Sequence, residues 1–194
     1  MFNFRLAAFA LLAMTVPVTS TIRGQGHQDP GPLMAAQREA MKQLAILDGI
    51  WRGPAWTILP SGEKRMVTQT ERVGSFLDGS VKVIEGKGYE ADGSVAFNAF
   101  ATVSYSPATR AYNLRTYAQG NVGDFALKPT ADGYIWEIAA GQMTIRYTVV
   151  IKDGTWHEVG DRIMPGREPI RFMEMNLKRV GDTKWPAEGA VSPK

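Results

Sequence analysis

Turn-forming residues recur at short intervals through most of this chain, and they limit the folds that it can adopt. Nine turn signals follow Ile50, and four of them are the pair Asp-Gly. Asp-Gly is a strong hairpin signal, because both central residues of the tightest turn need a positive φ. The nine signals separate ten segments rich in β-branched and aromatic residues, so the sequence predicts ten antiparallel strands. The signals are Ser61-Gly62, Asp78-Gly79, Asp92-Gly93, Ser106-Pro107, Gly120-Asn121, Asp132-Gly133, Gly141-Gln142, Asp153-Gly154 and Pro165-Gly166.

Apolar and polar residues alternate within these segments, as expected of strands with one buried face. Apolar side chains occupy every second position from Met143 to Ile151, and again from Phe97 to Tyr105. An open sheet of this size has two unpaired edges, which closure into an up-and-down barrel removes. A mainly β fold is therefore predicted, an up-and-down antiparallel β-barrel of about ten strands, with a β-sandwich as the alternative. The strands are short and carry no aromatic girdles, which disfavours an outer-membrane barrel.

One helical segment precedes the strands. Residues 33–47 carry apolar side chains at helical spacing, and this stripe needs a surface to cover. We expect the helix to close or flank one end of the barrel. The predicted organisation is a signal peptide at 1–20, a flexible lead-in at 21–32, a lipocalin-like barrel domain at 33–180 and a polar C-terminal tail at 181–194.

The first twenty residues have the layout of a secretory signal peptide. A short basic start is followed by the apolar run 6–16, and then by small or β-branched residues at 17–20. The run is short for a membrane span, although an uncleaved anchor and a buried helix are the alternatives. We expect an exported protein, periplasmic or secreted, with no transmembrane domain after cleavage.

Composition excludes several classes of function. The 194-residue chain contains no cysteine, which rules out a disulfide framework, thiolate metal sites and thiol catalysis. Lys and Arg never occur in runs longer than two, and the formal net charge is only +3, so nucleic-acid binding is disfavoured. With two histidines and no recognised ligand spacing, we predict no metal site. Phosphate-loop, nucleophile-elbow and metalloprotease motifs are also absent from the sequence.

The segment Gly49-Ile50-Trp51-Arg52-Gly53 opens the first predicted strand with a Gly-x-Trp-x-Gly pattern. This pattern resembles the one found at the start of calycin-type barrels, the lipocalins and nitrobindin-like proteins. The segments 104–107, 112–120 and 154–158 are similar to those of an uncharacterised family of exported lipocalin-like proteins. The resemblance implies that Trp51 closes the barrel floor and that the interior holds a small molecule. Nitrobindin-like barrels bind haem through a last-strand histidine. The last predicted strand here, 170–177, has none, so no cofactor is predicted although haem is not excluded.

The candidate site combines aromatic side chains with a few polar groups. Arg115 and Tyr117 share one strand face, and intracellular lipid-binding barrels use a similar Arg-x-Tyr pair to hold a carboxylate. Glu85 shares parity with apolar neighbours, where a carboxyl facing a cavity would have a raised pKa. For each of these groups the alternative is an ordinary structural or solvent-facing role. The predicted ligand-binding residues are Trp51, Arg72, Glu85, Tyr105, Arg115, Tyr117, Trp136, Tyr147 and His157.

These observations favour a binding protein over an enzyme. The leading hypothesis is an exported barrel that holds a small apolar or amphipathic molecule in its interior. The first alternative is an enzyme of isomerase, cyclase or lyase type, using a carboxylate, His or Tyr in the same cavity. The second is a ligand-free envelope interaction module with a filled barrel. The sequence leaves a homodimer open, and we predict no catalytic residue.

Overall fold

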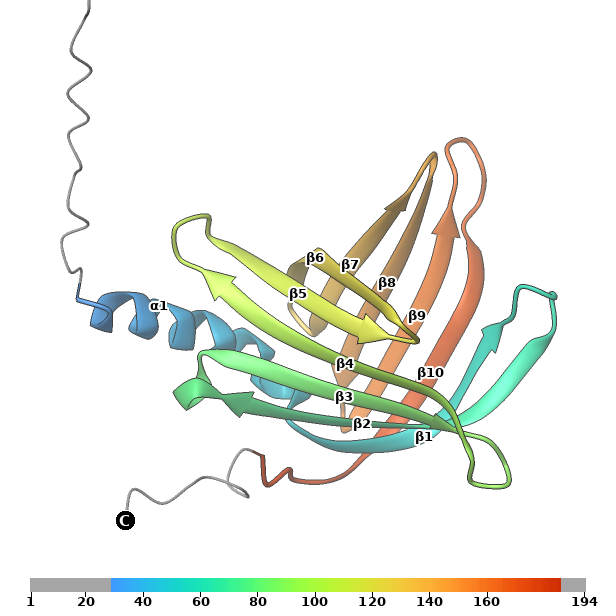
Figure 1. Cartoon of the computed structure of the whole chain (residues 1–194), viewed down its shortest axis with the longest axis horizontal. Coiled ribbons are helices and arrows are strands. Elements are labelled where there is room, and N and C mark those ends of the chain that lie inside the picture. Colours follow the sequence, from blue (N-terminus) through green and yellow to red (C-terminus); the bar gives the residue numbers. More distant parts are fainter. Residues whose placement is uncertain (1–28, 186–194) are drawn as a thin grey trace, which may run out of the picture.

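The ten predicted strands form a closed barrel in the computed structural model, which describes residues 29–185. Each strand pairs antiparallel with its neighbours in sequence, and the last strand pairs with the first, which confirms the up-and-down topology (Figure 1). The strands are β1 (Gly49–Ile58), β2 (Lys64–Phe76), β3 (Val81–Tyr89), β4 (Val95–Ser106), β5 (Ala111–Ala118), β6 (Asn121–Thr130), β7 (Gly133–Ala140), β8 (Met143–Lys152), β9 (Thr155–Ile163) and β10 (Ile170–Gly181).

The predicted hairpin turns fall between consecutive strands. At Asp153-Gly154 both residues have positive φ, 49° and 66°, as the tight turn requires. Asp132-Gly133 differs, because Gly133 already belongs to β7 and has no positive φ. A Cβ at Gly133 would collide with the carbonyl of Val149 on β8, so close backbone approach explains this glycine.

The barrel wall is uneven around its circumference. Most neighbouring strands pair over eight or more residues, as β4 and β5 do from Ala99↔Ala118 to Ser106↔Ala111. In contrast, β6 and β7 pair over only four residues, from Leu127↔Trp136 to Thr130↔Gly133. The remainder of β6, from Asn121 onward, pairs only with β5. The wall is therefore split between β6 and β7 over half their length.

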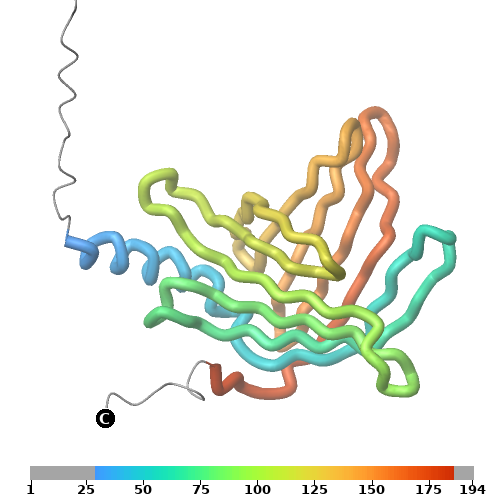
Figure 2. The backbone as a smooth tube through the Cα atoms, viewed as in Figure 1, coloured from blue at the N-terminus to red at the C-terminus, as the bar shows by residue number. Residues whose placement is uncertain are grey.

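A single helical segment closes one end of the barrel. The helix α1 (Gly31–Met41) continues into the 3₁₀ turn η1 (Lys42–Leu47), and prolines near its start favour the first turn. The Tyr112 hydroxyl donates a 2.7 Å hydrogen bond to the carbonyl of Ala40, which ties α1 to β5. Figure 1 shows α1 across this end. The β1–β2, β3–β4 and β9–β10 connections lie at the opposite end (Figure 2).

The hydrophobic core fills the helical end. Leu44 and Leu47 of η1 are fully buried against Trp51 and Trp156, whose rings meet edge to face at 5.7 Å. The Trp51 Nε1–H donates to the carbonyl of Leu47 at 2.9 Å, so the tryptophan fixes the end of η1. Val73, Val103, Leu114, Leu127 and Leu177 complete this core from other strands.

The predictions for the two ends of the chain fall only partly within the described residues. The predicted signal peptide and most of the lead-in lie outside the described residues, as does the end of the polar tail. The start of that tail packs on the outer wall: the Trp185 ring meets Phe76 at 5.9 Å, and the Arg72 guanidinium lies 5.3 Å from the Trp185 ring centroid. Of the helices in the described residues, none has the length and apolarity needed to span a bilayer.

Candidate functional site

A cavity of about 650 Å³ occupies the half of the barrel away from α1. Its deepest lining residues adjoin the packed core, and its outermost come from the connections at the far end, such as Leu59 and Gln119, and from the start of β6 at Asn121. The cavity therefore opens at the end that α1 does not cover. Most of its lining is apolar or aromatic, including Ala55, Val67, Ile84, Phe97, Leu114, Phe125, Trp136, Ile138, Phe172, Met173 and Met175.

Small residues on one wall create this space. Gly86, Ala99 and Ala118 stand in register on β3, β4 and β5, and all three line the cavity. A row without large side chains leaves the interior of these strands open, whereas bulky residues would fill a barrel of this size. The small inward-facing residues of this wall therefore contribute to the cavity.

The facing wall is aromatic. Trp136 and Tyr147 stack with ring centroids 4.2 Å apart and planes 7° from parallel. Phe125 lies 5.1 Å from Trp136, and Phe172 meets Tyr147 edge to face at 5.9 Å. Burial raises the pKa of Tyr147 to about 12, so its hydroxyl stays protonated at physiological pH. This wall offers a broad apolar surface to a flat or chain-like molecule.

Two carboxyl groups lie deep in this otherwise apolar cavity. Glu71 on β2 and Glu158 on β9 are both buried and both line it. Gln69 donates a 2.7 Å hydrogen bond to Glu71 from its Nε2, and the Trp156 Nε1–H donates to Glu158 at 3.2 Å. Neither carboxyl takes part in any ion pair found between residues 29 and 185.

Burial raises the pKa of both carboxyl groups to values near neutral pH. Desolvation raises the pKa of Glu71 to about 8, and the nearby charge of Glu158 adds to the effect. Desolvation likewise raises the pKa of Glu158 to about 7, against the hydrogen bond from Trp156. Tyr134 on β7 is buried beside them, and desolvation raises its pKa well above the usual value, with a further contribution from the charges of Glu158 and Glu71. The carboxyl groups of Glu71 and Glu158 can therefore accept hydrogen bonds, hold a charge or exchange a proton near pH 7.

The structure divides the predicted site residues into three groups. Trp136 and Tyr147 line the cavity. Trp51 and Tyr105 also face inward but belong to the packed closed end, where Tyr105 lies 4.9 Å from the Tyr112 ring. The other five, Arg72, Glu85, Arg115, Tyr117 and His157, lie on the outer wall and do not line the interior cavity.

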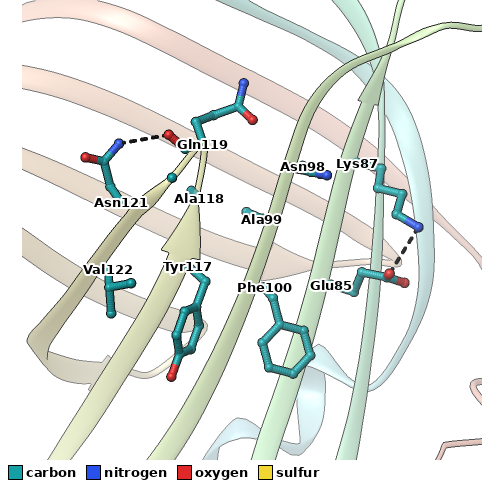
Figure 3. Close-up of a pocket in the computed structure, with 11 residues that line it drawn as sticks. Glu85, Lys87, Asn98, Ala99, Phe100, Tyr117, Ala118, Gln119, Asn121 and Val122 are labelled. Carbon is teal, nitrogen blue, oxygen red and sulfur yellow. Dashed lines mark hydrogen bonds and ion pairs between the residues drawn. The ribbon is translucent and has the colours of Figure 1, made fainter.

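The outer-wall residues have partners of their own. The Arg115 Nε–H donates to the Tyr117 hydroxyl at 2.8 Å, and Arg115 pairs with Asp124 at 2.9 Å. Glu85 and Tyr117 line a second, more open hollow of about 400 Å³ on the outside of β3 to β6, with Phe100 between them (Figure 3). His157 hydrogen-bonds to Glu174 at 3.1 Å between Nε2 and Oε1.

Alternation alone misassigned the inner face of β3. The apolar parity there, with Val81 and Val83, suggested that Glu85 faces inward. The structure instead turns Ile84 and Gly86 inward, and a Cβ at Gly86 would lie 2.6 Å from a Glu71 carboxyl oxygen. The inner face carries glycine because Glu71 occupies the space, so hydrophobicity points to the wrong side. For the same reason, the hydrophobic pattern did not identify Glu71 as a cavity residue.

The donors around the cavity do not suit the haem that the nitrobindin resemblance suggests. Of residues 29–185, those that line the cavity include no histidine, and His157 faces the opposite side of β9 from Glu158. Within residues 29–185, no group of three or more His, Asp or Glu side chains is placed to hold a metal ion. Histidine-ligated haem therefore has no counterpart among these residues.

Of the comparisons with known proteins, only the search of solved structures gives matches. No family model matches the sequence, and no curated protein matches it. Among solved structures, Rv2717c from M. tuberculosis matches with a TM-score of 0.55 and 12% identity, covering 73% of this chain and 97% of that one. The S-type phycobiliprotein lyase CPES from Guillardia theta matches with a TM-score of 0.48 and 8% identity, covering 78% and 99%. The likeness to Rv2717c, with the closed ten-stranded barrel, identifies a calycin-like, lipocalin-like barrel fold.

Proposed function

We propose that this protein is an exported binding protein that holds one small, mainly apolar molecule inside its barrel. The observation that carries the proposal is the cavity of about 650 Å³, which is open at one end and lined mostly by apolar and aromatic side chains. Its volume falls within the range of about 300–1,000 Å³ that is usual for small-molecule sites. A filled barrel serving only for interaction does not fit this cavity.

The aromatic wall, the wall of small residues and the deep carboxyl groups have different roles in ligand binding. The stacked pair Trp136 and Tyr147 supports the apolar body of the ligand, while the low wall at Ala99 and Ala118 leaves room for it. Glu71 and Glu158 face the deep end and bind its polar part. Burial of the apolar body supplies the affinity, and the carboxyl groups supply orientation.

Blocking the cavity tests this function directly. Ala99→Phe places a ring inside the cavity, whereas Ala126→Phe places the same ring on the exposed outer face of β6. Titration with the neutral dye Nile red should show at least about tenfold weaker binding for Ala99→Phe and unchanged binding for Ala126→Phe. Equal binding by the two variants would place the dye outside the barrel and remove the basis of the proposal.

Export is the second part of the proposal. It rests on the signal-peptide layout of residues 1–20 and on the resemblance to exported lipocalin-like proteins. Expression of the full chain in a bacterium, with fractionation and an intact mass, tests it. A mature protein outside the cytoplasm, shorter by about twenty residues, is expected. A full-length cytoplasmic protein would contradict export while leaving the cavity proposal in place.

An enzyme is the second candidate, and one observation favours it. Glu71 and Glu158 have pKa values raised to about 8 and about 7, the range in which a carboxyl serves as general acid or base. Any molecule recovered with the purified protein can be incubated with it in D₂O and followed by NMR. Deuterium uptake that disappears in Glu71→Gln and Glu158→Gln would indicate isomerase or lyase chemistry. Unchanged ligand would support binding alone.

A further inference from the structure

Among residues 29–185, no basic side chain pairs with the carboxyl group of Glu71 or Glu158. Each receives one hydrogen bond, from Gln69 and from Trp156, although a carboxylate has room for about four. Gly86 makes room for the Glu71 carboxyl itself, because any Cβ there would lie within 3 Å of both carboxyl oxygens. The site therefore offers hydrogen-bond acceptors that the protein itself uses only in part.

The nearest inward-facing cations are already engaged. Lys82 is buried at the closed end, where its Nζ lies 2.6 Å from Asp48 and 2.8 Å from the Ser75 hydroxyl. Arg65 lines the mouth of the cavity and is paired with Glu90. Arg162 lies over the Phe172 ring, 4.8 Å from its centroid. Each cation has a partner other than the two deep carboxyl groups.

We propose that the cavity selects an amphiphilic amine, whose protonated nitrogen binds Glu71 and Glu158 while its apolar body lies along Trp136 and Tyr147. This inference deepens the proposed function and rests on it. A cation gains most from carboxylates in a low-dielectric interior, because their attraction is little screened there. A ligand carboxylate would meet like charges, and a neutral alcohol would gain only ordinary hydrogen bonds.

The surroundings of the two carboxyl groups determine how binding depends on pH. Across the sheet, Glu71 pairs with Trp51 and Gly86, and Glu158 pairs with Val149 and Met175, none of which titrates. The titratable side chains that face the pair are Tyr134 from β7 and Tyr147 from β8, and Glu85 acts on Glu71 from the other side of β3. The tyrosines stay neutral, so the carboxyl groups themselves govern the dependence. An ammonium binds their ionised form, and its affinity therefore rises from pH 5.5 to pH 8.

Three ten-carbon probes separate charge from apolarity: decylamine, decanol and decanoate, each used to displace Nile red from the full-length protein. At pH 8 decylamine should bind at least about tenfold tighter than decanol, and decanoate should bind least tightly. Glu71→Gln and Glu158→Gln keep the side-chain size and remove the charge. Each should reduce the affinity for decylamine toward that for decanol, with decanol binding unchanged within about twofold. Glu137→Gln, on the outer wall of β7 where Glu137 pairs with Arg146, is the matched control and should bind like the parent.

The outcomes distinguish this inference from the function on which it rests. Decylamine binding no tighter than decanol, or decanoate binding tighter than both, overturns amine selection and leaves the binding function intact. Failure of Nile red and all three probes to bind contradicts the binding function itself. Thermal melts of both Gln variants establish that they are folded, and either variant suffices for the comparison.

Discussion

The two ends of this barrel use the same ten strands in opposite ways. At the closed end, Leu44, Leu47 and Trp51 are almost completely buried, and the Trp51 and Lys82 side chains both have hydrogen-bond partners. The open half contains a cavity, a split between β6 and β7, and two buried carboxyl groups that form no ion pair within the part of the chain that the structure describes. Close packing and satisfied polar groups stabilise a fold, whereas buried unpaired acids destabilise it.

The difference indicates that the closed end stabilises the fold and the open half binds the ligand. The stability of the packed closed end allows the open half to keep buried carboxyl groups that by themselves destabilise the fold. Natural proteins depart from the rules of good packing mainly at functional sites. The predictions below test whether stability and binding are indeed separated in this way.

The largest effect is expected at the closed end. Leu47→Ala removes a side chain with no exposed surface and leaves a cavity that its packed neighbours cannot fill. We expect the free energy of unfolding to fall by about 3 kcal/mol, measured by urea denaturation. The control is Ile46→Ala, next in sequence and 42% exposed, which should cost less than about 1 kcal/mol. Equal losses of unfolding free energy in the two variants would show that the packed closed end is not the stabilising region.

The next effect comes from the deep carboxyl of Glu71. Its pKa is raised from 4.5 in the unfolded chain to about 8 in the folded protein, so the folded state holds the proton more tightly. Stability should therefore fall as the pH rises from about 4.5 to 8. Glu71→Gln should flatten this slope and raise the free energy of unfolding at pH 8 by about 2 kcal/mol. Melts across this pH range measure the slope, with Glu137→Gln as the outer-wall control. A slope unchanged by Glu71→Gln would contradict the assignment.

A smaller difference is expected in backbone dynamics. The part of β6 that begins at Asn121 pairs with β5 alone, whereas β5 pairs on both sides. Amides in residues 121–126 should exchange with solvent at least about tenfold faster than those of 112–117, measured by hydrogen–deuterium exchange mass spectrometry. Bound decylamine should slow this exchange if the split adjoins the filled cavity. Equal protection in both segments would show that the wall is continuous in solution.

The smallest effect is expected on the outer wall. Arg115→Gln removes the ion pair with Asp124 and the hydrogen bond to Tyr117, both exposed and outside the cavity. Decylamine and Nile red affinities should change by less than about twofold, because exposed pairs contribute little and do not touch the ligand. A large loss of affinity would move the binding site to the outer hollow beside Tyr117.

Much of the architecture was predictable from local patterns. Asp-Gly pairs and alternating segments reveal ten strands, and the inward face of β4 from Phe97 to Tyr105 matches the sequence expectation. Inward-facing Tyr147 on β8 was predicted for the same reason. These predictions hold because each depends on neighbours in sequence, such as turn geometry and the two-residue period of a strand.

The residues of the site were harder to predict from the sequence. Glu71 and Glu158 occupy inward positions that alternation would assign to apolar residues, and Gly86 replaces the bulky residue expected opposite Glu71. Where a cavity needs glycine and acids on its inner face, the hydrophobic pattern no longer marks that face. The prediction therefore favoured Glu85, Arg72 and His157, which the fold turns outward.

By itself, the sequence determined the number of strands, their order, the position of the single helix and the absence of cysteine chemistry. Only the tertiary structure decided which carboxyl groups meet in the interior. Glu71 and Glu158 are far apart in the chain, on β2 and β9, and share one cavity because β1 pairs with β10 and closes the barrel. Burial then shifts their pKa values, since desolvation depends on everything that surrounds a group in space and not on its neighbours in sequence.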